Sequence, residues 1–296
     1  MVIALNSALP NIQKSVSIIG LGPDNLTVQR SNTANTNFRI FTTVNAITVD
    51  ISGMTIADGR TDVGEPGGGI RNDRLATMDL YNVEVIRNMG SSGGGIFNEG
   101  TMTVENSRIT LNQTPFWGYG GGICNAGGRL WIQSDSRIRF NEAYDGGDVC
   151  NFRGGTMTIT DSDILSNHAK VFGGGIFIDG NFSMSGGSVR SNSVGSGRPV
   201  NPIVDGPANG GGIYIDFDAG AVGKTISITR VSIASNSADK GGGFYAAGGT
   251  VTFTNCAFTL NTATTLGAAG CWARGNFGVS LIFCTGQPAT DFGEDS

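Results

Sequence analysis

The chain has 296 residues, of which 48 are glycine and one is histidine; 15% are charged, and the formal net charge is −5. Glycine and β-branched residues are poor helix formers, so this composition argues against an α-rich enzyme. The low density of Lys and Arg argues against a nucleic-acid surface, and the regular recurrence of apolar residues argues against disorder. No apolar run reaches the roughly 18 residues that a membrane-spanning helix needs.

The first 66 residues contain two short stretches, 15–22 and 47–59, that resemble degenerate copies of a repeat found later in the chain. The N-terminus begins directly in an apparent strand and lacks the basic segment and long apolar core of a signal peptide. We therefore expect residues 1–66 to be degenerate N-terminal coils. We also expect the natural protein to extend further and to be secreted or displayed at the cell surface.

A repeat runs from residue 67 to residue 285. Glycine pairs or triplets open its units at Gly67, Gly93, Gly120, Gly146, Gly173, Gly210 and Gly241, with a degenerate unit at Gly267. Most units are 26 or 27 residues long, and a fixed period between about 20 and 50 residues indicates a stacked-repeat architecture. The predicted repeat domain covers residues 1–286, and residues 287–296 read as a tail or linker.

Polar and apolar residues alternate within each unit. In residues 101–107, Met102 and Val104 alternate with threonines, and residues 156–162, 225–231 and 250–256 follow the same pattern. Alternation marks strands with one buried face, here separated by turns rich in Gly and Asn. If each short strand pairs in parallel with its copy in the next unit, the result is an all-β parallel β-helix. The sequence predicts about ten coils of roughly 26 residues, each rising about 4.8 Å.

Asparagine recurs at two further places in the repeat. The main series is Asn88, Asn112, Asn141, Asn167, Asn192, Asn236 and Asn261, each three residues after an apolar side chain. A shorter series is Asn72, Asn98, Asn125 and Asn151, which gives way to Ile178 and Ile215. We expect both series to stack at corners of the solenoid as ladders of hydrogen-bonded amides.

The combined pattern of GGGI-x-N, T-x-T-x-x-N-S and I-x-x-N resembles the right-handed parallel β-helix repeats of the pectin-lyase-like superfamily, over residues 16–285. It is closest to repeats of large bacterial surface proteins. It is also similar to the GGA-[ILV] and F-x-x-N repeats of chlamydial polymorphic membrane proteins, although only Phe258–Asn261 fits F-x-x-N literally. The resemblance implies a right-handed β-helix. For function it leaves open lyases, hydrolases, epimerases, tailspikes and adhesins.

The segments between each main-series asparagine and the next glycines vary most, and stacking places them on one edge, the loop edge: 113–119, 142–148, 168–172 and 194–209. Its candidate ligand-binding residues are Phe116, Trp117, Tyr119, Tyr144, Arg198 and Asp205. Sugar rings stack on aromatic side chains and sugar hydroxyls bond to carboxylates, so the loop edge is a candidate glycan-binding site. The alternative is that the aromatic residues only seal the loops and the aspartates only form turns.

Two other functions remain open. In a polysaccharide lyase or glycoside hydrolase acting at the loop edge, the candidate catalytic residues are Asp145, Asp148, His168 and Lys170, because carboxylates about 5–10 Å apart cleave glycosidic bonds. Asp148 stands out because it replaces the third glycine of its triplet. The N-T-D, G-H-G and R-I-K motifs of polygalacturonases are absent. The T-x-T pairs suit an ice-binding solenoid, but Trp131, Asn181 and Ser183 interrupt that array.

Cysteines occupy equivalent positions in consecutive coils, Cys124 with Cys150 and Cys256 with Cys284, so each pair is either two small core residues or a disulfide. No cofactor or metal site is expected, apart from weak Ca²⁺ binding by the aspartates at 179, 216 and 218.

We expect a structural or adhesive β-helix that presents its loop edge to a polysaccharide, a cell-surface glycan or another partner. Flanking domains of a larger protein are the other expected partners, and the open solenoid ends allow self-association. Nucleic acid and a membrane span are not expected.

Overall fold

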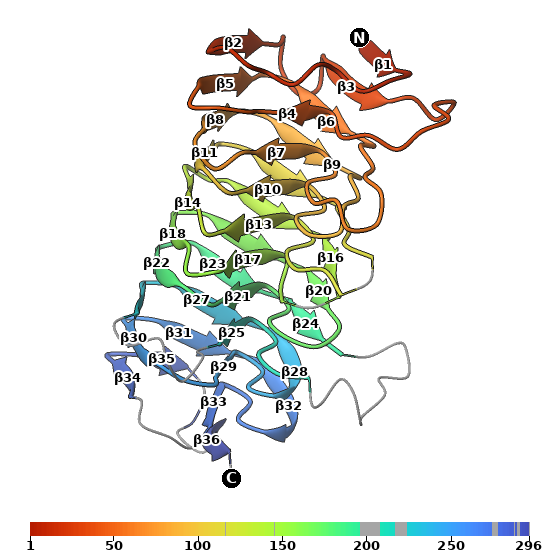
Figure 1. Cartoon of the computed structure of the whole chain (residues 1–296). Coiled ribbons are helices and arrows are strands. Elements are labelled where there is room, and N and C mark those ends of the chain that lie inside the picture. The colour runs from red at the N-terminus through yellow and green to blue at the C-terminus, as the bar shows by residue number, and fades with distance from the viewer. Residues whose placement is uncertain are drawn as a thin grey trace.

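The computed structural model describes residues 1–115, 117–144, 146–195, 208–216, 224–273, 278–286, 288 and 291–295. These residues contain no α-helix. Their strands form four sheets with parallel pairing, and the chain winds as a β-solenoid of about ten turns, with its two ends at opposite ends of the stack (Figure 1). The predicted all-β parallel β-helix is therefore confirmed.

Each coil contributes one strand to each sheet it crosses. The first sheet, which follows the glycines, contains β4 (Phe41–Thr42), β7 (Ile70–Asn72), β10 (Ile96–Asn98), β13 (Ile123–Ala126), β17 (Val149–Phe152), β21 (Ile176–Ile178), β25 (Ile213–Ile215), β29 (Phe244–Ala246), β33 (Gly270–Ala273) and β36 (Phe292–Asp295). The second sheet contains β2 (Val16–Ile19), β5 (Thr48–Ser52), β8 (Thr77–Tyr81), β11 (Thr101–Glu105), β14 (Arg129–Gln133), β18 (Thr156–Thr160), β22 (Asn181–Ser185), β26 (Thr225–Thr229), β30 (Thr250–Thr254) and β34 (Val279–Ile282).

The third sheet contains β1 (Val2–Leu5), β3 (Thr27–Arg30), β6 (Thr55–Ala57), β9 (Glu84–Ile86), β12 (Arg108–Thr110), β15 (Arg137–Arg139), β19 (Asp163–Leu165), β23 (Ser188–Arg190), β27 (Ser232–Ala234), β31 (Ala257–Thr259) and β35 (Thr285–Gly286). The short fourth sheet contains β16 (Glu142–Ala143), β20 (His168–Ala169), β24 (Ser193–Val194), β28 (Ser237–Lys240) and β32 (Thr262–Leu266). β36 lies in the segment expected to be a tail, and it pairs with β33.

Equivalent residues of successive coils lie in columns. Met102, for example, pairs with Met78 on one side and Leu130 on the other. Because strand side chains alternate between faces, one set of columns fills the interior with Ile, Val, Leu, Met and Phe, while the threonines face outward. The outward threonine columns are interrupted where Thr101 pairs with Arg129 and where Thr103 pairs with Trp131.

Sharp corners separate the sheets. The chain leaves the third sheet through a residue with left-handed backbone, with φ between 52° and 57°, at Arg87, Leu111, Phe140, Ser166, Ser191, Ser235 and Leu260. Left-handed backbone costs a non-glycine residue about 1–2 kcal/mol. At each of these corners the next residue is a main-series asparagine, whose side chain is buried. Hydrogen bonds made by that asparagine offset the backbone strain.

Both predicted asparagine ladders are confirmed. In the main ladder each Nδ2 donates to Oδ1 of the next asparagine, as from Asn112 to Asn141 at 3.0 Å, and also to a carbonyl oxygen of the preceding coil. The backbone N–H of Asn112 donates to the same Oδ1. The shorter ladder runs from Asn72 through Asn98 at 2.8 Å, and it ends where Ile178 replaces asparagine. Every ladder amide thus has hydrogen-bond partners, which offset the desolvation cost of burying a polar group inside the coil.

A second apolar layer covers the outer face of the first sheet. This outer apolar cluster consists of Phe97, Cys124, Ala126, Cys150, Phe177, Tyr214, Tyr245 and Cys271. All five thiols of the chain are free. The cysteines of this cluster therefore act as small packing residues rather than as disulfides.

Candidate functional site

Three predicted residues of the loop edge come together beside the fourth sheet. Trp117 is 63% exposed, and its ring centroid lies 4.7 Å from that of Tyr144. Lys170 places its Nζ 4.5 Å from the centre of the Tyr144 ring. The three side chains come from successive coils and lie one after another, with the Trp117 and Tyr144 rings tilted by 49° to each other; we call them the Trp117–Tyr144–Lys170 stack. A cation over an aromatic ring at an exposed position contributes about 0.5–1 kcal/mol.

Local hydrogen bonds hold this stack in place. The Thr114 hydroxyl donates to the Gly118 carbonyl at 3.1 Å, which closes the loop that carries Trp117. The backbone N–H of Lys170 donates to the Tyr144 carbonyl at 3.1 Å, which fixes these two residues in register. Trp117 itself has left-handed backbone, with φ of 49°. The chain therefore holds a strained loop with a large apolar ring turned to solvent.

Tyr119 and His168 lie apart from the stack. The Tyr119 ring stacks on Phe152 with centroids 4.9 Å apart and also contacts Phe177, so it seals the outer apolar cluster. His168 is half-buried, with Nδ1 3.0 Å from the Ser193 hydroxyl, and burial lowers the pKa of its imidazole. Four other predicted residues lie outside the described residues: Phe116, Asp145, Arg198 and Asp205.

Asp148 belongs to the loop-edge segment 142–148 but is fully buried. Its place in the triplet is one where a Cβ has little room, because a Cβ on the equivalent Gly175 would lie 2.9 Å from the Asn192 amide nitrogen. The chain adapts through Gly147, which has φ of 55°, unlike the second glycine of the neighbouring triplets. The Asp148 carboxyl then turns toward Gly121 in the preceding coil.

The Asp148 carboxyl has no hydrogen-bond partner among the described residues. Burial raises its pKa well above 3.8, and the charge of Glu142 adds to the rise. The nearby backbone N–H of His168 acts to lower this pKa, but that N–H donates its hydrogen bond to the Asn141 carbonyl oxygen and not to the carboxyl. The side chain is thus a buried, poorly solvated acid, which a polymer at the surface does not reach.

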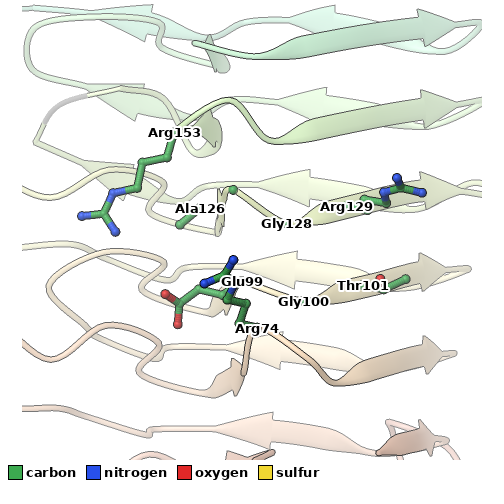
Figure 2. Close-up of a pocket in the computed structure, with 9 residues that line it drawn as sticks. Arg74, Glu99, Gly100, Thr101, Ala126, Gly128, Arg129 and Arg153 are labelled. Atoms are coloured by element: carbon green, nitrogen blue, oxygen red, sulfur yellow. The ribbon is translucent and has the colours of Figure 1, made fainter. Parts of the chain in front are cut away.

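A recess that the sequence did not predict lies at the corner between the first and second sheets (Figure 2). Its volume is about 400 Å³, and it is lined by Arg74, Glu99, Gly100, Thr101, Ala126, Gly127, Gly128, Arg129 and Arg153. We call it the arginine recess. Asn98 and Thr101 are separated by two residues, whereas four residues separate Asn72 from Thr77. The short corner is therefore set back between longer neighbours.

Glycines keep the floor of the arginine recess open. A Cβ on Gly100 would overlap the carbonyl oxygens of Asp73 and Ala76, and a Cβ on Gly128 would lie 2.7 Å from the Asn98 amide nitrogen. Close stacking at the shorter ladder thus requires glycine there, which leaves the corner without side chains. A sequence signal was present, because arginine recurs in this corner in three of four consecutive coils, at positions 74, 129 and 153.

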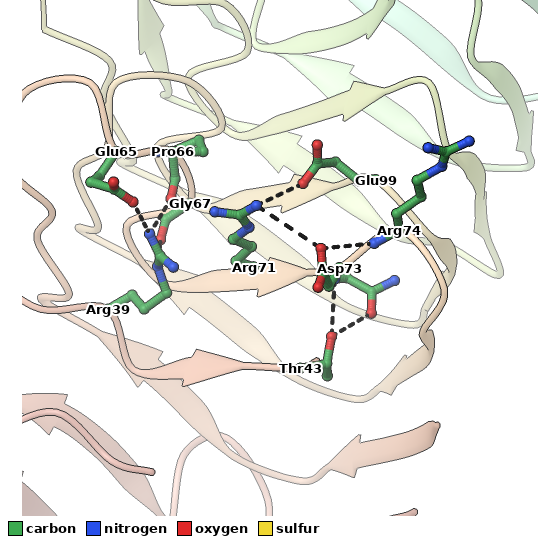
Figure 3. Close-up of polar contacts among 10 residues, drawn as sticks. Arg39, Thr43, Glu65, Pro66, Gly67, Arg71, Asp73, Arg74 and Glu99 are labelled. Carbon is green, nitrogen blue, oxygen red and sulfur yellow. Dashed lines mark hydrogen bonds and ion pairs between the residues drawn. The ribbon is translucent and has the colours of Figure 1, made fainter. Parts of the chain in front are cut away.

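The arginines near the recess fall into two groups. Arg39 and Arg71 have carboxylate partners: Arg39 is 3.1 Å from Glu65, and Arg71 is 3.0 Å from Glu99 and 4.0 Å from Asp73 (Figure 3). In the described part of the chain, no ion pair forms at Arg74, Arg129 or Arg153. Their side chains are exposed around the glycine floor.

Acidic residues do not gather into a metal site in the described residues. No group of three His, Cys, Asp or Glu side chains has the arrangement to hold an ion. Asp179, one of the aspartates considered for Ca²⁺, is paired with Lys224 at 2.6 Å. Asp218 lies outside the described residues. In the described ranges the structure has no helix with the length and apolarity to cross a membrane.

The fold and these two surfaces define a parallel β-solenoid with a decorated edge and a basic corner. Comparisons with protein-family models, with curated proteins and with solved structures give no match for this chain. The assignment thus stays at the level of the fold. Kinship with the pectin-lyase-like superfamily stays a prediction from the repeat pattern.

Proposed function

We propose that the chain is a rigid binding module that acts at the cell surface or outside the cell and holds a glycan along its loop edge. The observation that carries this proposal is the Trp117–Tyr144–Lys170 stack. Trp117 is 63% exposed, its ring contacts that of Tyr144 in the next coil, and the Lys170 ammonium of the coil after that lies over the Tyr144 ring. A ring presented in this way offers an apolar face for a sugar to stack on.

The rival function, a polysaccharide lyase or glycoside hydrolase at the same edge, gains no support. Asp148 is buried, Asp145 lies outside the described residues, and the His168 ring is held by Ser193. Ice binding gains none either, because Arg129 and Trp131 interrupt the flat threonine array. Membership of the pectin-lyase-like superfamily and a bacterial surface location belong to the same proposal.

The test is retention of the purified chain on a panel of neutral and acidic plant, algal and bacterial polysaccharides, with reducing ends measured in parallel. We expect one polymer to bind without turnover. Trp117→Ala should weaken that binding about 30-fold or more, because a tryptophan hot spot contributes about 2 kcal/mol or more. Tyr81→Ala is the matched control, since Tyr81 is 53% exposed on the second sheet. Equal affinity for wild type and Trp117→Ala, or retention by no polymer, would refute the proposal.

A further inference from the structure

The arginine recess carries an excess of positive charge on an acidic chain. Its lining holds Arg74, Arg129 and Arg153 against one carboxylate, Glu99, which leaves a net charge of about +2. The whole chain has a formal net charge of −5. Glu99 and the neighbouring Asp73 already lie next to Arg71, so the three guanidinium groups of the recess keep their donors free of carboxylate partners within the described residues.

The three guanidinium groups come from three coils and surround a floor with few side chains (Figure 2). Arginine offers a planar fork of N–H donors that matches carboxylate and sulfate oxygens in pairs. The backbones of Arg74 and Arg153 are three coils apart, about 14 Å at about 4.8 Å per coil, and their side chains lean toward one another along the axis while Arg129 lies to one side (Figure 2). Such a spread of positive charges suits several anionic groups carried on one linear ligand.

A second recess of about 320 Å³ adjoins the first and shares Glu99, Ala126 and Arg153 with it. Its lining adds two aromatic rings, Phe97 and Phe152, and two hydroxyl side chains, Ser91 and Ser92. Phe97 is buried and Tyr119 stacks on Phe152, so these rings form an apolar wall, whereas serine hydroxyls can bond to sugar hydroxyls. The combined furrow therefore offers hydroxyl-bonding groups directly beside anion-binding groups.

We infer that this furrow is a second binding site, separate from the loop edge, and that it takes an acidic polysaccharide whose sulfate or carboxylate groups lie against Arg74, Arg129 and Arg153. The site does not depend on Trp117. Extended polyanions such as nucleic acid fit less well, because the positive charge is confined to one corner of an acidic chain.

The test measures binding of the intact chain to dextran sulfate, to polygalacturonate and to neutral dextran at low ionic strength. Dextran and dextran sulfate differ only in sulfate, so we expect binding to an acidic polymer and none to dextran. The sulfate and carboxylate polymers then identify the group that is recognised. Binding should fall as salt is added, because exposed charges are screened.

Three variants localise the binding. Arg129→Gln with Arg153→Gln should lower affinity about tenfold or more, the equivalent of about one charge-assisted contact. Arg137→Gln with Arg190→Gln makes the same charge change on exposed residues of the third sheet and should leave affinity unchanged. Gly127→Asn fills the recess without changing its charge and should also lower affinity. The substitution fits the backbone, because Gly127 has φ of 80°, which Asn tolerates, and the new Cβ would lie 3.7 Å from the nearest atom, the Arg153 carbonyl oxygen.

Each remaining outcome would overturn the inference. Equal losses in both double variants would mean that only overall charge matters. No binding to either acidic polymer would mean that the furrow is not a polysaccharide site. Equal or stronger binding of poly-glutamate, lost in Arg129→Gln with Arg153→Gln, would assign the furrow to acidic peptides. Loss of binding in Trp117→Ala alone would place the acidic ligand on the loop edge.

Discussion

Replacing Asp148 should stabilise the protein, and increasingly so as the pH rises. The carboxyl is fully buried without a hydrogen-bond partner among the described residues, and burial raises its pKa well above 3.8. The native state therefore binds a proton that the unfolded state has released. Stability is fully retained below the unfolded pKa and is lost as the pH rises toward the folded pKa.

The magnitude has two parts. An unsatisfied buried polar group costs about 1–3 kcal/mol at any pH. Linkage adds about 1.4 kcal/mol for each unit of difference between the folded and unfolded pKa, once the pH exceeds both. Asp148→Gly removes both costs and restores the glycine triplet, while extra freedom of the unfolded chain subtracts about 0.4–1 kcal/mol. We expect a gain of about 1 kcal/mol near pH 4 and a larger gain at pH 8.

Asp148→Asn separates the two parts, because it keeps a buried polar group and removes the titration. Thermal unfolding followed by far-ultraviolet circular dichroism from pH 4 to pH 8 gives the comparison, at about 2 °C per kcal/mol for a large domain. The wild type should lose stability relative to Asp148→Asn as the pH rises. Asp135→Asn, at an exposed aspartate, is the control. The reasoning is refuted if Asp148→Asn loses stability with rising pH as steeply as the wild type does. It is also refuted if Asp148→Gly is less stable than the wild type at every pH.

Two further substitutions test the corners. Asn141→Ala should destabilise the fold by about 3 kcal/mol or more, because the side-chain amide and the backbone N–H of Asn112 lose their acceptor and the Ile109 carbonyl loses its donor. The midpoint of thermal unfolding measures this loss. A loss below about 1 kcal/mol would contradict the stabilising role of the ladder. Leu260→Asn should stabilise the fold by about 1 kcal/mol, because Leu260 is 78% exposed with φ of 55° and Asn tolerates left-handed backbone. The control is Leu75→Asn, at a leucine that is 70% exposed and has no positive φ. This variant should show no gain in stability in the same assay.

The parts of the fold that repeat were predictable from the sequence. Alternation fixes which side chains face the interior, and the recurring landmarks of each unit fix which residues stack, so the pairing of Ile109 with Val85 and Ile138 follows. The ladder asparagines were predictable for the same reason. A buried amide that recurs once per coil meets its own copy, and that copy supplies both the donor and the acceptor.

The candidate site was predictable only in part. Trp117 and Tyr119 are two residues apart in one loop, and neither alternation nor spacing tells which ring faces solvent. Trp117 reaches Tyr144, whereas Tyr119 folds back over Phe152. The arginine recess was missed because its shape depends on the relative lengths of corners in neighbouring coils. No single unit contains that information.

Asp148 shows how column position outweighs residue type in a solenoid. As an aspartate between aromatic loops it suggested a catalytic acid, but its column is occupied by glycine at positions 122 and 175. Those glycines mark a place where a Cβ meets the ladder amides, so a side chain there must be buried or displace the backbone. Surface chemistry belongs instead to positions where a side chain has room to stay exposed. Trp117 meets this criterion at the loop edge, as do Arg129 and Arg153 at the basic corner, and for that reason the two binding experiments begin with these residues.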